Sequence, residues 1–243
     1  MILGIEVWVV VVLAATLTLG AAIQGLVGLG LALVAAPVTT LIAPELMPDL
    51  LLWLAFVMPF VTLVREHHRI DWRGLGWALP ARVPGTVVGV LFVGWFSARE
   101  MGIAVGLMVL LSVILTVGSL RLPVSRRNLL AAGFVSGITG TATSIGGPPM
   151  AILYQHREPL QIRTTLAIYF MLGAAFSLVG LGVAGSLTLE PLLLAVLLLP
   201  CLVVGFLVSR VLHRYLPSHH VRPGVLLVCA LSAVVLLVRS LFA

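Results

Sequence analysis

Uninterrupted apolar runs of up to about 20 residues recur along this chain, and they limit its possible folds more than any other feature. A helix of that length crosses the hydrocarbon core of a bilayer. Of the 243 residues, 61% are hydrophobic and only 9% are charged, whereas soluble domains carry about 25% charged residues. The alternating pattern of membrane barrel strands is absent. We therefore predict an all-α integral membrane protein.

Hydropathy divides the chain into ten apolar segments, which predict about 8 to 10 transmembrane or half-membrane helices. The segments are 5–24, 29–43, 48–65, 74–97, 100–119, 128–141, 144–155, 162–184, 189–209 and 222–241. Segments 29–43, 128–141 and 144–155 are too short to cross a flat bilayer alone. We expect these three to enter the membrane as parts of helical hairpins.

The sequence also contains a weak internal repeat. "GLVGLGLALVAAP" at 25–37 aligns with "GITGTATSIGGPP" at 137–149 after a shift of 112 positions, and "PGTVVG" at 84–89 aligns with "PCLVVG" at 200–205 after a shift of 116. Two matched blocks in the same order predict a duplication. The predicted parts are a first transmembrane repeat at 1–119, a cytoplasmic linker at 120–127 and a second repeat at 128–243.

Arginine placement predicts how the repeats are oriented, because short cytoplasmic loops collect basic residues. All fourteen basic residues are Arg, and most lie in loops 65–73, 120–127, 155–163 and 209–222. These loops all face the cytoplasm if each Gly-rich pair of segments is a hairpin that returns to its starting side, with the N-terminus outside. Each repeat then makes an odd number of crossings, so the two are inverted, as is typical of secondary transporters. The absence of Lys suggests a bacterial source and hence the cytoplasmic membrane.

The stretch "GITGTATSIGGPPM" at 137–150 interrupts the apolar sequence with four glycines, four hydroxyls and two prolines. Non-helical backbone at membrane depth is tolerated where protein covers it or where it lines a wet cavity, so we predict a hairpin tip. Pro148 and Pro149 suit the first turn of a helix running to Tyr154, whose positive dipole end would face the tip. The glycines would permit close backbone approach and positive φ angles.

An anion is the predicted guest of this tip, because hydroxyls and a helix N-terminus donate hydrogen bonds without adding a full charge. The substrate-binding residues predicted in the second repeat are Ser136, Thr139, Gly140, Thr141, Thr143, Ser144, Gly146 and Gly147. In the first repeat they are Gln24, which aligns with Ser136, together with Gly28 and Gly30. Small and hydroxyl residues also line ordinary helix contacts in membranes, so packing alone is the alternative interpretation.

Two arginines are further candidates for contact with the anion. Arg82 lies about eight residues inside its predicted span, between Pro80 and Pro84, at a depth where a charge needs a partner, water or an interface. A substrate or gating role for Arg82 is therefore weighed equally against snorkelling. Arg163 opens a span on the cytoplasmic side, where it either anchors to headgroups or attracts substrate. No Asp or Glu lies in mid-span, so no buried carboxylate relay is visible.

Other classes of site are not indicated by the sequence. The basic residues form no stripe interleaved with aromatics, so no nucleic-acid partner is predicted. Cys201 and Cys229 lie inside apolar runs without metal-type spacing, and neither a metal nor a cofactor is predicted. Ser136 before Gly137 faintly resembles an intramembrane serine protease, but the nearest His, His156, lies at a loop edge. We predict that the chain is not an enzyme; no oligomeric state is predicted.

These blocks resemble a known family. "GLVGLGLALVAAP" and "SGITGTATSIGGPPMAILYQ" are similar to the paired signature blocks of the sulfite exporter TauE/SafE family of membrane permeases, and the Pro-x4-Gly elements at 84–89 and 200–205 fit the same pattern. The resemblance implies transport of a small sulfur-containing anion such as sulfite or an organosulfonate. With the inverted repeats, we predict a permease, an exporter working by alternating access across the lipid bilayer. An anion channel would share the same polar tips and is the alternative.

Overall fold

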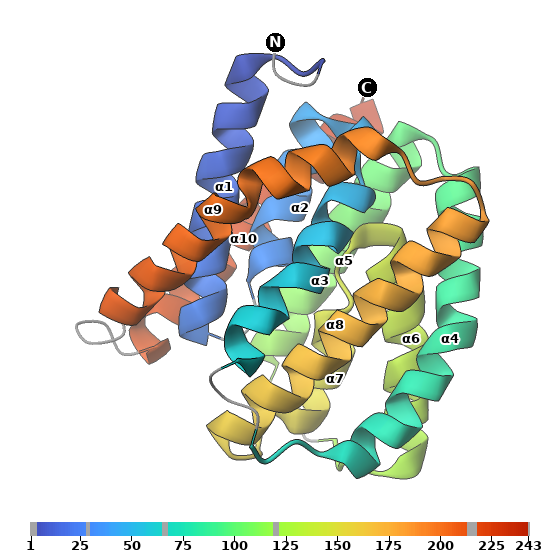
Figure 1. Ribbon diagram of the computed structural model, residues 1–243, viewed down its shortest axis with the longest axis vertical. Helices are drawn as coiled ribbons and strands as arrows, with labels where there is room; N and C mark the ends of the chain where they lie inside the picture. The colour runs from blue at the N-terminus through green and yellow to red at the C-terminus, as the bar shows by residue number, and fades with distance from the viewer. Residues whose placement is uncertain (1–3, 28–29, 65–67, 119–121, 213–217, 243) are drawn as a thin grey trace. The chain divides into compact units, whose positions relative to one another are not determined.

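The computed structural model describes residues 4–27, 30–64, 68–118, 122–212 and 218–242, and these residues form α-helices and one short 3-10 helix without a strand (Figure 1). The helical elements are α1 (Val7–Val27), α2 (Leu31–Ile42), η1 (Pro44–Leu46), α3 (Asp49–Leu63), α4 (Trp72–Trp95), α5 (Ala98–Val117), α6 (Arg126–Thr143), α7 (Gly147–Tyr154), α8 (Pro159–Val183), α9 (Leu189–Leu212) and α10 (Ser218–Phe242). The all-α prediction is confirmed, and each predicted apolar segment corresponds to one α-helix.

The helix bounds differ from the predicted segments on both sides of the second hairpin tip. Helix α6 extends the segment 128–141 at both ends and has 18 residues. It begins after Ser125, whose hydroxyl accepts a hydrogen bond from the Asn128 N–H, as N-cap side chains do. It ends at Thr143, and the next residue, Ser144, has left-handed backbone angles (φ 60°, ψ 7°). Helix α7 begins at Gly147, three residues into the apolar segment 144–155, with Pro148 and Pro149 in its first turn as predicted.

Helix length separates the spans from the short arms. Among the described residues, six helices are long and apolar enough to cross a membrane, namely α1, α4, α5, α8, α9 and α10. At about 1.5 Å per residue, the 12 residues of α2 and the 8 residues of α7 fall well short of a hydrocarbon core of about 30 Å. Each Gly-rich hairpin thus pairs a long arm, α1 or α6, with a short arm. Large exposed apolar side chains on the spans, such as Trp95 and Val183, suit a lipid environment. The chain is a multi-pass membrane protein.

The helices group into two compact units, and each unit takes helices from both predicted repeats. The first unit comprises Met1–Leu51, Ser97–Val113 and Thr188–Ala243, and the second comprises Leu52–Phe96 and Ile114–Leu187. In the first unit α1 packs on α9 and α2 packs on α10; in the second, α6 packs on α4 and α7 packs on α8 (Figure 1). Each hairpin therefore packs against at least one helix from the other predicted repeat.

Small residues allow α1 and α9 to approach closely in the first unit. A β-carbon added at Gly205 of α9 would overlap the Thr18 carbonyl of α1. One added at Gly25 of α1 would instead overlap the side chain of Ser209. The two helices meet through glycine on each side, a common form of close packing between membrane helices.

The contact between α4 and α6 in the second unit is built from backbone. Helix α6 carries a Gly-x3-Gly motif, Gly133 and Gly137, where added β-carbons would overlap the carbonyls of Ala78 and Arg82 on α4. A β-carbon at Gly85 of α4 would likewise overlap the backbone of α6. Because no side chain separates the two helices here, groups carried by α4 are held close to the tip that follows α6.

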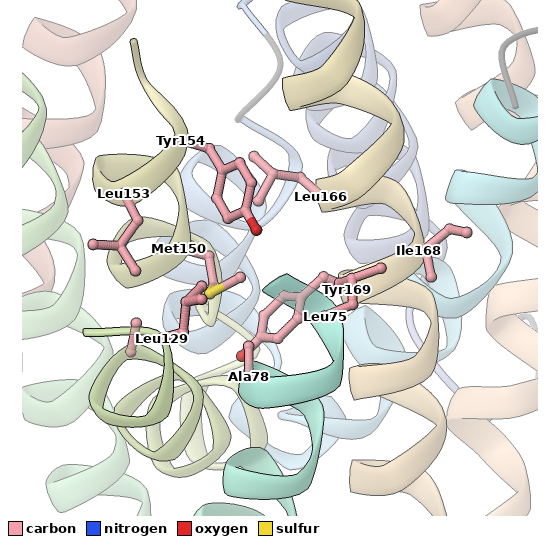
Figure 2. Packing of buried hydrophobic residues seen from close by; sticks show 10 residues of the cluster. Leu75, Ala78, Leu129, Met150, Leu153, Tyr154, Leu166, Ile168 and Tyr169 are labelled. Carbon is pink, nitrogen blue, oxygen red and sulfur yellow. The ribbon is translucent and has the colours of Figure 1, made fainter. Parts of the chain in front are cut away.

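An apolar cluster fixes the short helix α7 in the second unit. Met150, Leu153 and Tyr154 of α7 are buried against Leu75 of α4 and Tyr169 of α8 (Figure 2). Met150, Tyr154 and Tyr169 have no exposed surface. Helix α7 has only 8 residues, too few for a stable isolated helix, so its position depends on this packing.

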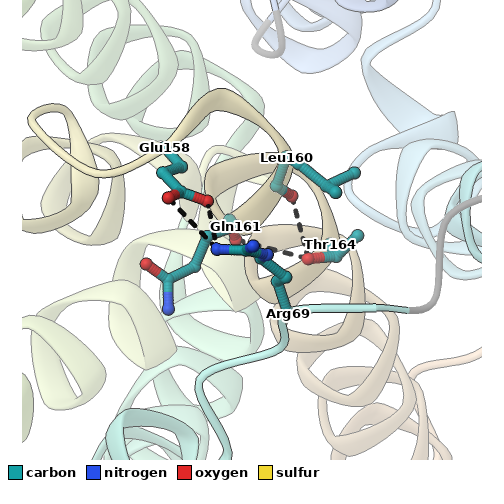
Figure 3. Close-up of polar contacts among 5 residues, drawn as sticks. All are labelled: Arg69, Glu158, Leu160, Gln161 and Thr164. Atoms are coloured by element: carbon teal, nitrogen blue, oxygen red, sulfur yellow. Dashed lines mark hydrogen bonds and ion pairs between the residues drawn. The ribbon is translucent and has the colours of Figure 1, made fainter.

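Polar contacts join the loop before α4 to α7 and α8. The Tyr154 hydroxyl donates to Asp71 Oδ2 at 2.8 Å, and the Asp71 N–H donates to the Thr165 hydroxyl at 3.1 Å. Arg69 Nη1 reaches both carboxylate oxygens of Glu158, at 3.1 and 2.9 Å (Figure 3). The Arg69 and Glu158 side chains are 63% and 62% exposed, so this ion pair adds little stability.

Candidate functional site

Arg82 is the only buried charged side chain among the described residues of the second unit, with 3% of its surface exposed. It lies ten residues after Trp72 on the 24-residue helix α4, which is about 15 Å along the helix axis and near its midpoint. Pro80 and Pro84 flank it within the same helix. Neither proline can donate a helical hydrogen bond. The sequence prediction that a charge lies deep in this span is confirmed.

The guanidinium connects α4 with both arms of the second hairpin. Arg82 Nη1 donates to the Ser136 hydroxyl of α6 at 3.0 Å, and that hydroxyl donates to the Gly146 carbonyl at 2.5 Å. Ser136 is fully buried. Its hydroxyl is held between a cation and a carbonyl, so it links α4 to both sides of the tip.

Helix α8 packs against the other side of the guanidinium. The Arg82 Cζ atom lies 4.8 Å from the centre of the Tyr169 ring, within the range of a cation–π contact. One turn further along α8, a β-carbon at Gly173 would overlap the guanidinium itself. On the α6 side, a β-carbon at Gly140 would lie 2.8 Å from Arg82 Nη2. Glycine at positions 140 and 173 leaves the space that the buried cation occupies.

Several buried polar atoms of the second unit lack a hydrogen-bond partner. They are Trp53 Nε1 on α3 and, on the helices around the guanidinium, Arg82 Nε, Thr86 Oγ1, Thr139 Oγ1 and the Tyr169 hydroxyl. No carboxylate among the described residues lies within ion-pair distance of Arg82. Buried polar groups are nearly always hydrogen-bonded, and a buried charge without a counter-charge is expensive. The arrangement therefore leaves hydrogen-bonding capacity and one positive charge for a ligand.

The tip between α6 and α7 is held by its own hydroxyls. The Thr143 hydroxyl donates to the Thr139 carbonyl at 2.7 Å and accepts a hydrogen bond from the Ile145 N–H at 3.3 Å. The expected close approach of Gly140 and Gly146 is found, since a β-carbon at Gly146 would lie 3.0 Å from the Ser136 carbonyl. The expectation of positive φ at these glycines is wrong, because Ser144 supplies the left-handed turn and Gly146 has φ −94°.

Helix α7 begins at Gly147, next to this group of residues, as the sequence predicted. Its second and third residues, Pro148 and Pro149, carry no N–H. The first turn therefore offers fewer backbone donors than an ordinary helix N-terminus. The side chains of α4, α6 and α8 supply most of the donors near this end of α7.

Thr141 connects α6 to α8, one turn after Gly137. Its hydroxyl lies 2.8 Å from the Ser177 hydroxyl, which in turn donates to the Gly173 carbonyl at 3.0 Å. Thr141 and Ser177 are fully buried. This pair satisfies its own hydrogen-bonding capacity, so its contribution to the site is to fix α8 against α6.

The remaining predicted residues lie elsewhere in the second unit, in the first unit or outside the described residues. Arg163 is exposed near the start of α8, ten residues before Gly173, which is about 15 Å along the helix. Gln24 and Gly30 belong to the first unit, where the Gln24 Oε1 atom accepts a hydrogen bond from the Leu31 N–H at 3.0 Å, at the start of α2. Gly30 is the residue before α2, and Gly28 lies outside the described residues.

Sequence reasoning missed three residues that the structure brings to Arg82. Thr86 follows Arg82 by one helical turn and could have been found from that spacing. Tyr169 and Gly173 lie on α8, within "YFMLG" of an apolar span. The sequence around Tyr169 and Gly173 does not distinguish them from residues that face lipid or pack against other helices. Their place beside Arg82 becomes visible only from the contact between α4 and α8.

Comparisons with known proteins agree with this architecture. The family model described as sulfite exporter TauE/SafE matches residues 12–236. The "probable sulfite/organosulfonate exporter TauE" of Cupriavidus necator (strain ATCC 17699 / DSM 428 / KCTC 22496 / NCIMB 10442 / H16 / Stanier 337) is 27% identical, over 82% of each chain. No solved structure matches the chain. Because the family model covers nearly its whole length, the chain belongs to the sulfite exporter TauE/SafE family.

Proposed function

We propose that the chain is a membrane permease that exports a small sulfur-containing oxyanion, of the sulfite or organosulfonate class, and that the anion binds at Arg82. The family match and the name of the similar Cupriavidus protein support the substrate class. The observation that supports the site is the buried guanidinium without a carboxylate partner among the described residues. We propose no catalytic role for any residue.

A purely structural role does not account for Arg82. A buried cation that only held three helices together could be replaced by apolar side chains without loss of stability, since removing charge from water is costly. Arg82 nevertheless keeps one hydrogen bond to Ser136 and an unpartnered Nε atom. An oxyanion beside the guanidinium would supply the missing negative charge and accept a hydrogen bond from the unpartnered Nε atom.

The other donors of the proposed site are neutral. Thr86, Thr139 and Tyr169 each have a buried hydroxyl oxygen without a partner, and each could donate to an anion oxygen. Hydroxyls strengthen binding less than further cations would. A site with one cation and several hydroxyls can bind an anion and still release it, which transport requires.

We propose that release alternates between the two sides of the membrane as two inverted repeats rearrange, with the N-terminus outside and the Arg-rich loops in the bacterial cytoplasm. The arginine distribution along the sequence supports this orientation. A membrane potential that is negative inside favours outward movement of an anion by about 2.3 kcal/mol per charge per 100 mV. Export therefore needs no buried carboxylate relay.

The test is flux of sulfite and methanesulfonate in proteoliposomes that contain the full chain. We expect saturable flux and counterflow with the wild type. Arg82→Gln should lower the flux about 100-fold, because loss of one partner from a buried, hydrogen-bonded charge pair costs about 2–5 kcal/mol. Arg82→Lys, which keeps the charge but loses the planar donor set, should retain part of the flux.

Arg127→Gln is the matched control, because Arg127 is exposed at the start of α6. Its flux should stay within about twofold of wild type. Equal flux in wild type and Arg82→Gln would refute the proposed site. Absence of flux for both anions in the wild type would refute the proposed substrate class, and non-saturating flux without counterflow would indicate a channel.

A further inference from the structure

We propose that the Arg82 site selects oxyanions with a single negative charge, so that hydrogensulfite and organosulfonates bind there while the sulfite dianion and sulfate do not. This inference rests on the proposed function and specifies its substrate. It follows from the number of charges buried around Arg82.

The site has one full charge. Four helices surround it, and the other charged side chains on them lie toward helix ends and are exposed: Arg73 on α4, Arg126 and Arg127 on α6, and Arg163 on α8. Asp71, just before α4, is eleven residues from Arg82, or about 16 Å along the axis. Its carboxylate already accepts hydrogen bonds from the Tyr154 hydroxyl and the Gly74 N–H.

One other charged side chain is buried among the described residues. Asp49, with 6% of its surface exposed, begins α3 in the first unit. Its carboxylate is hydrogen-bonded to the backbone of Thr188. Asp49 thus has its own local partner, and Arg82 is left with neutral neighbours in the second unit.

The charge count favours a monoanion. An anion with one negative charge neutralises the guanidinium, so the occupied site carries no net charge. A dianion would leave one negative charge in a buried region, where uncompensated charge is costly. The unpartnered hydroxyls of Thr86, Thr139 and Tyr169 can donate hydrogen bonds to either anion, but they cannot neutralise a second charge.

The predicted repeat offers no second cation. A shift of 116 residues, taken from the matched "PGTVVG" and "PCLVVG" blocks, aligns Arg82 with Leu198 and Thr86 with Leu202. Leu198 and Leu202 are buried on α9, with 2% and 5% of their surfaces exposed. Within the described residues, the positions of α9 that align with Arg82 and Thr86 therefore carry neither a charge nor a hydroxyl.

The experiment uses the wild-type chain in proteoliposomes with equal pH on both sides. Sulfite flux is measured across neutral pH, where hydrogensulfite loses its proton to give the sulfite dianion, and methanesulfonate flux is measured at each pH as a permanently monovalent reference. Protein-free liposomes give the leak. The readout is the ratio of sulfite to methanesulfonate flux, because any titration of the protein or of a coupled proton changes both fluxes.

We expect this ratio to fall about tenfold per pH unit once hydrogensulfite is the minor species. Sulfate in large excess should leave sulfite flux unchanged at every pH. A ratio that stays constant or rises with pH, or competition by sulfate, would overturn the monoanion proposal while leaving the proposed export function intact. Absence of flux for both probes would instead refute the proposed function on which this inference rests.

Discussion

The two Gly-rich hairpins share an outline and differ in polarity. In both, a polar residue at the aligned positions 24 and 136 connects the long arm to the start of the short arm. Gln24 accepts a hydrogen bond from the first N–H of α2, whereas Ser136 donates to the Gly146 carbonyl just before α7. Only Ser136 also binds an arginine. Among the described residues, both hairpins therefore have a polar link between their arms, and the link of the second hairpin also contacts a charged side chain.

Around these junctions the first hairpin is apolar and the second is not. A shift of 112 residues aligns Thr139, Thr143 and Ser144 with Val27, Leu31 and Ala32. The first unit packs α1 on α9 without those hydroxyls, so a hairpin of this kind does not need them to fold. We infer that the polar groups of the second hairpin are retained for the anion. The predictions below test this comparison, from the largest expected effect to the smallest.

The largest difference should come from adding a methyl group to each long arm. Gly137→Ala would push a β-carbon into the α4 backbone at Arg82 and Thr86, which cannot move without separating the helices. Gly25→Ala meets the side chain of Ser209, which has more freedom to shift. We expect Gly137→Ala to lower the free energy of unfolding by about 3 kcal/mol and Gly25→Ala by about 1 kcal/mol. Thermal unfolding in detergent measures both values.

Gly76→Ala is the control for both variants, because no atom lies within 4 Å of a β-carbon added at Gly76 on α4. It should leave stability unchanged or raise it by up to about 1 kcal/mol, since alanine favours helix over glycine. Equal destabilisation by Gly137→Ala and Gly25→Ala would contradict the view that Gly137 packs on backbone whereas Gly25 packs on a side chain that can shift.

The second difference should come from the two aligned polar residues. Ser136→Ala leaves Arg82 Nη1 and the Gly146 carbonyl without their shared partner, so we expect about a tenfold fall in flux, equivalent to about 1.4 kcal/mol. Gln24→Ala removes a cap from α2 and should cost about 1 kcal/mol of stability with flux within about twofold of wild type. Flux and unfolding are measured on the same preparations; equal flux losses would remove the proposed difference between the hairpins.

Much of the fold could be predicted from the sequence, because bilayer thickness sets a length that hydropathy reveals directly. The prolines correctly predicted the first turn of α7, but the predicted apolar segment 144–155 begins three residues earlier, because Ser144, not a glycine, adopts the left-handed angles of the tip. Such an angle depends on the contacts around the tip, which local composition does not contain. The division into two sequence repeats and their inversion stay predictions.

The site was predictable only where residues are chemically unusual for their surroundings. Arg82 and Ser136 are 54 positions apart, yet each attracts attention alone, as a charge within a span and as a hydroxyl at a Gly-rich tip. Tyr169, Gly173 and Ser177 are ordinary residues of an apolar helix. Their relation to Arg82 depends on how α8 is rotated against α4, and that rotation is set by packing over the whole helix.

The smallest effect should come from Arg69, an exposed arginine of the second unit that forms an ion pair. Arg69 pairs with Glu158, but water surrounds both side chains, so Arg69→Gln should change the free energy of unfolding by less than about 0.5 kcal/mol and leave flux within about twofold. Glu158→Gln should do the same, and the small coupling should vanish at high salt. Since Arg69 and Arg82 carry the same charge on the same unit, a loss of flux in Arg69→Gln comparable to that in Arg82→Gln would mean that the unit's overall charge, rather than a buried cation without a counter-charge, determines transport.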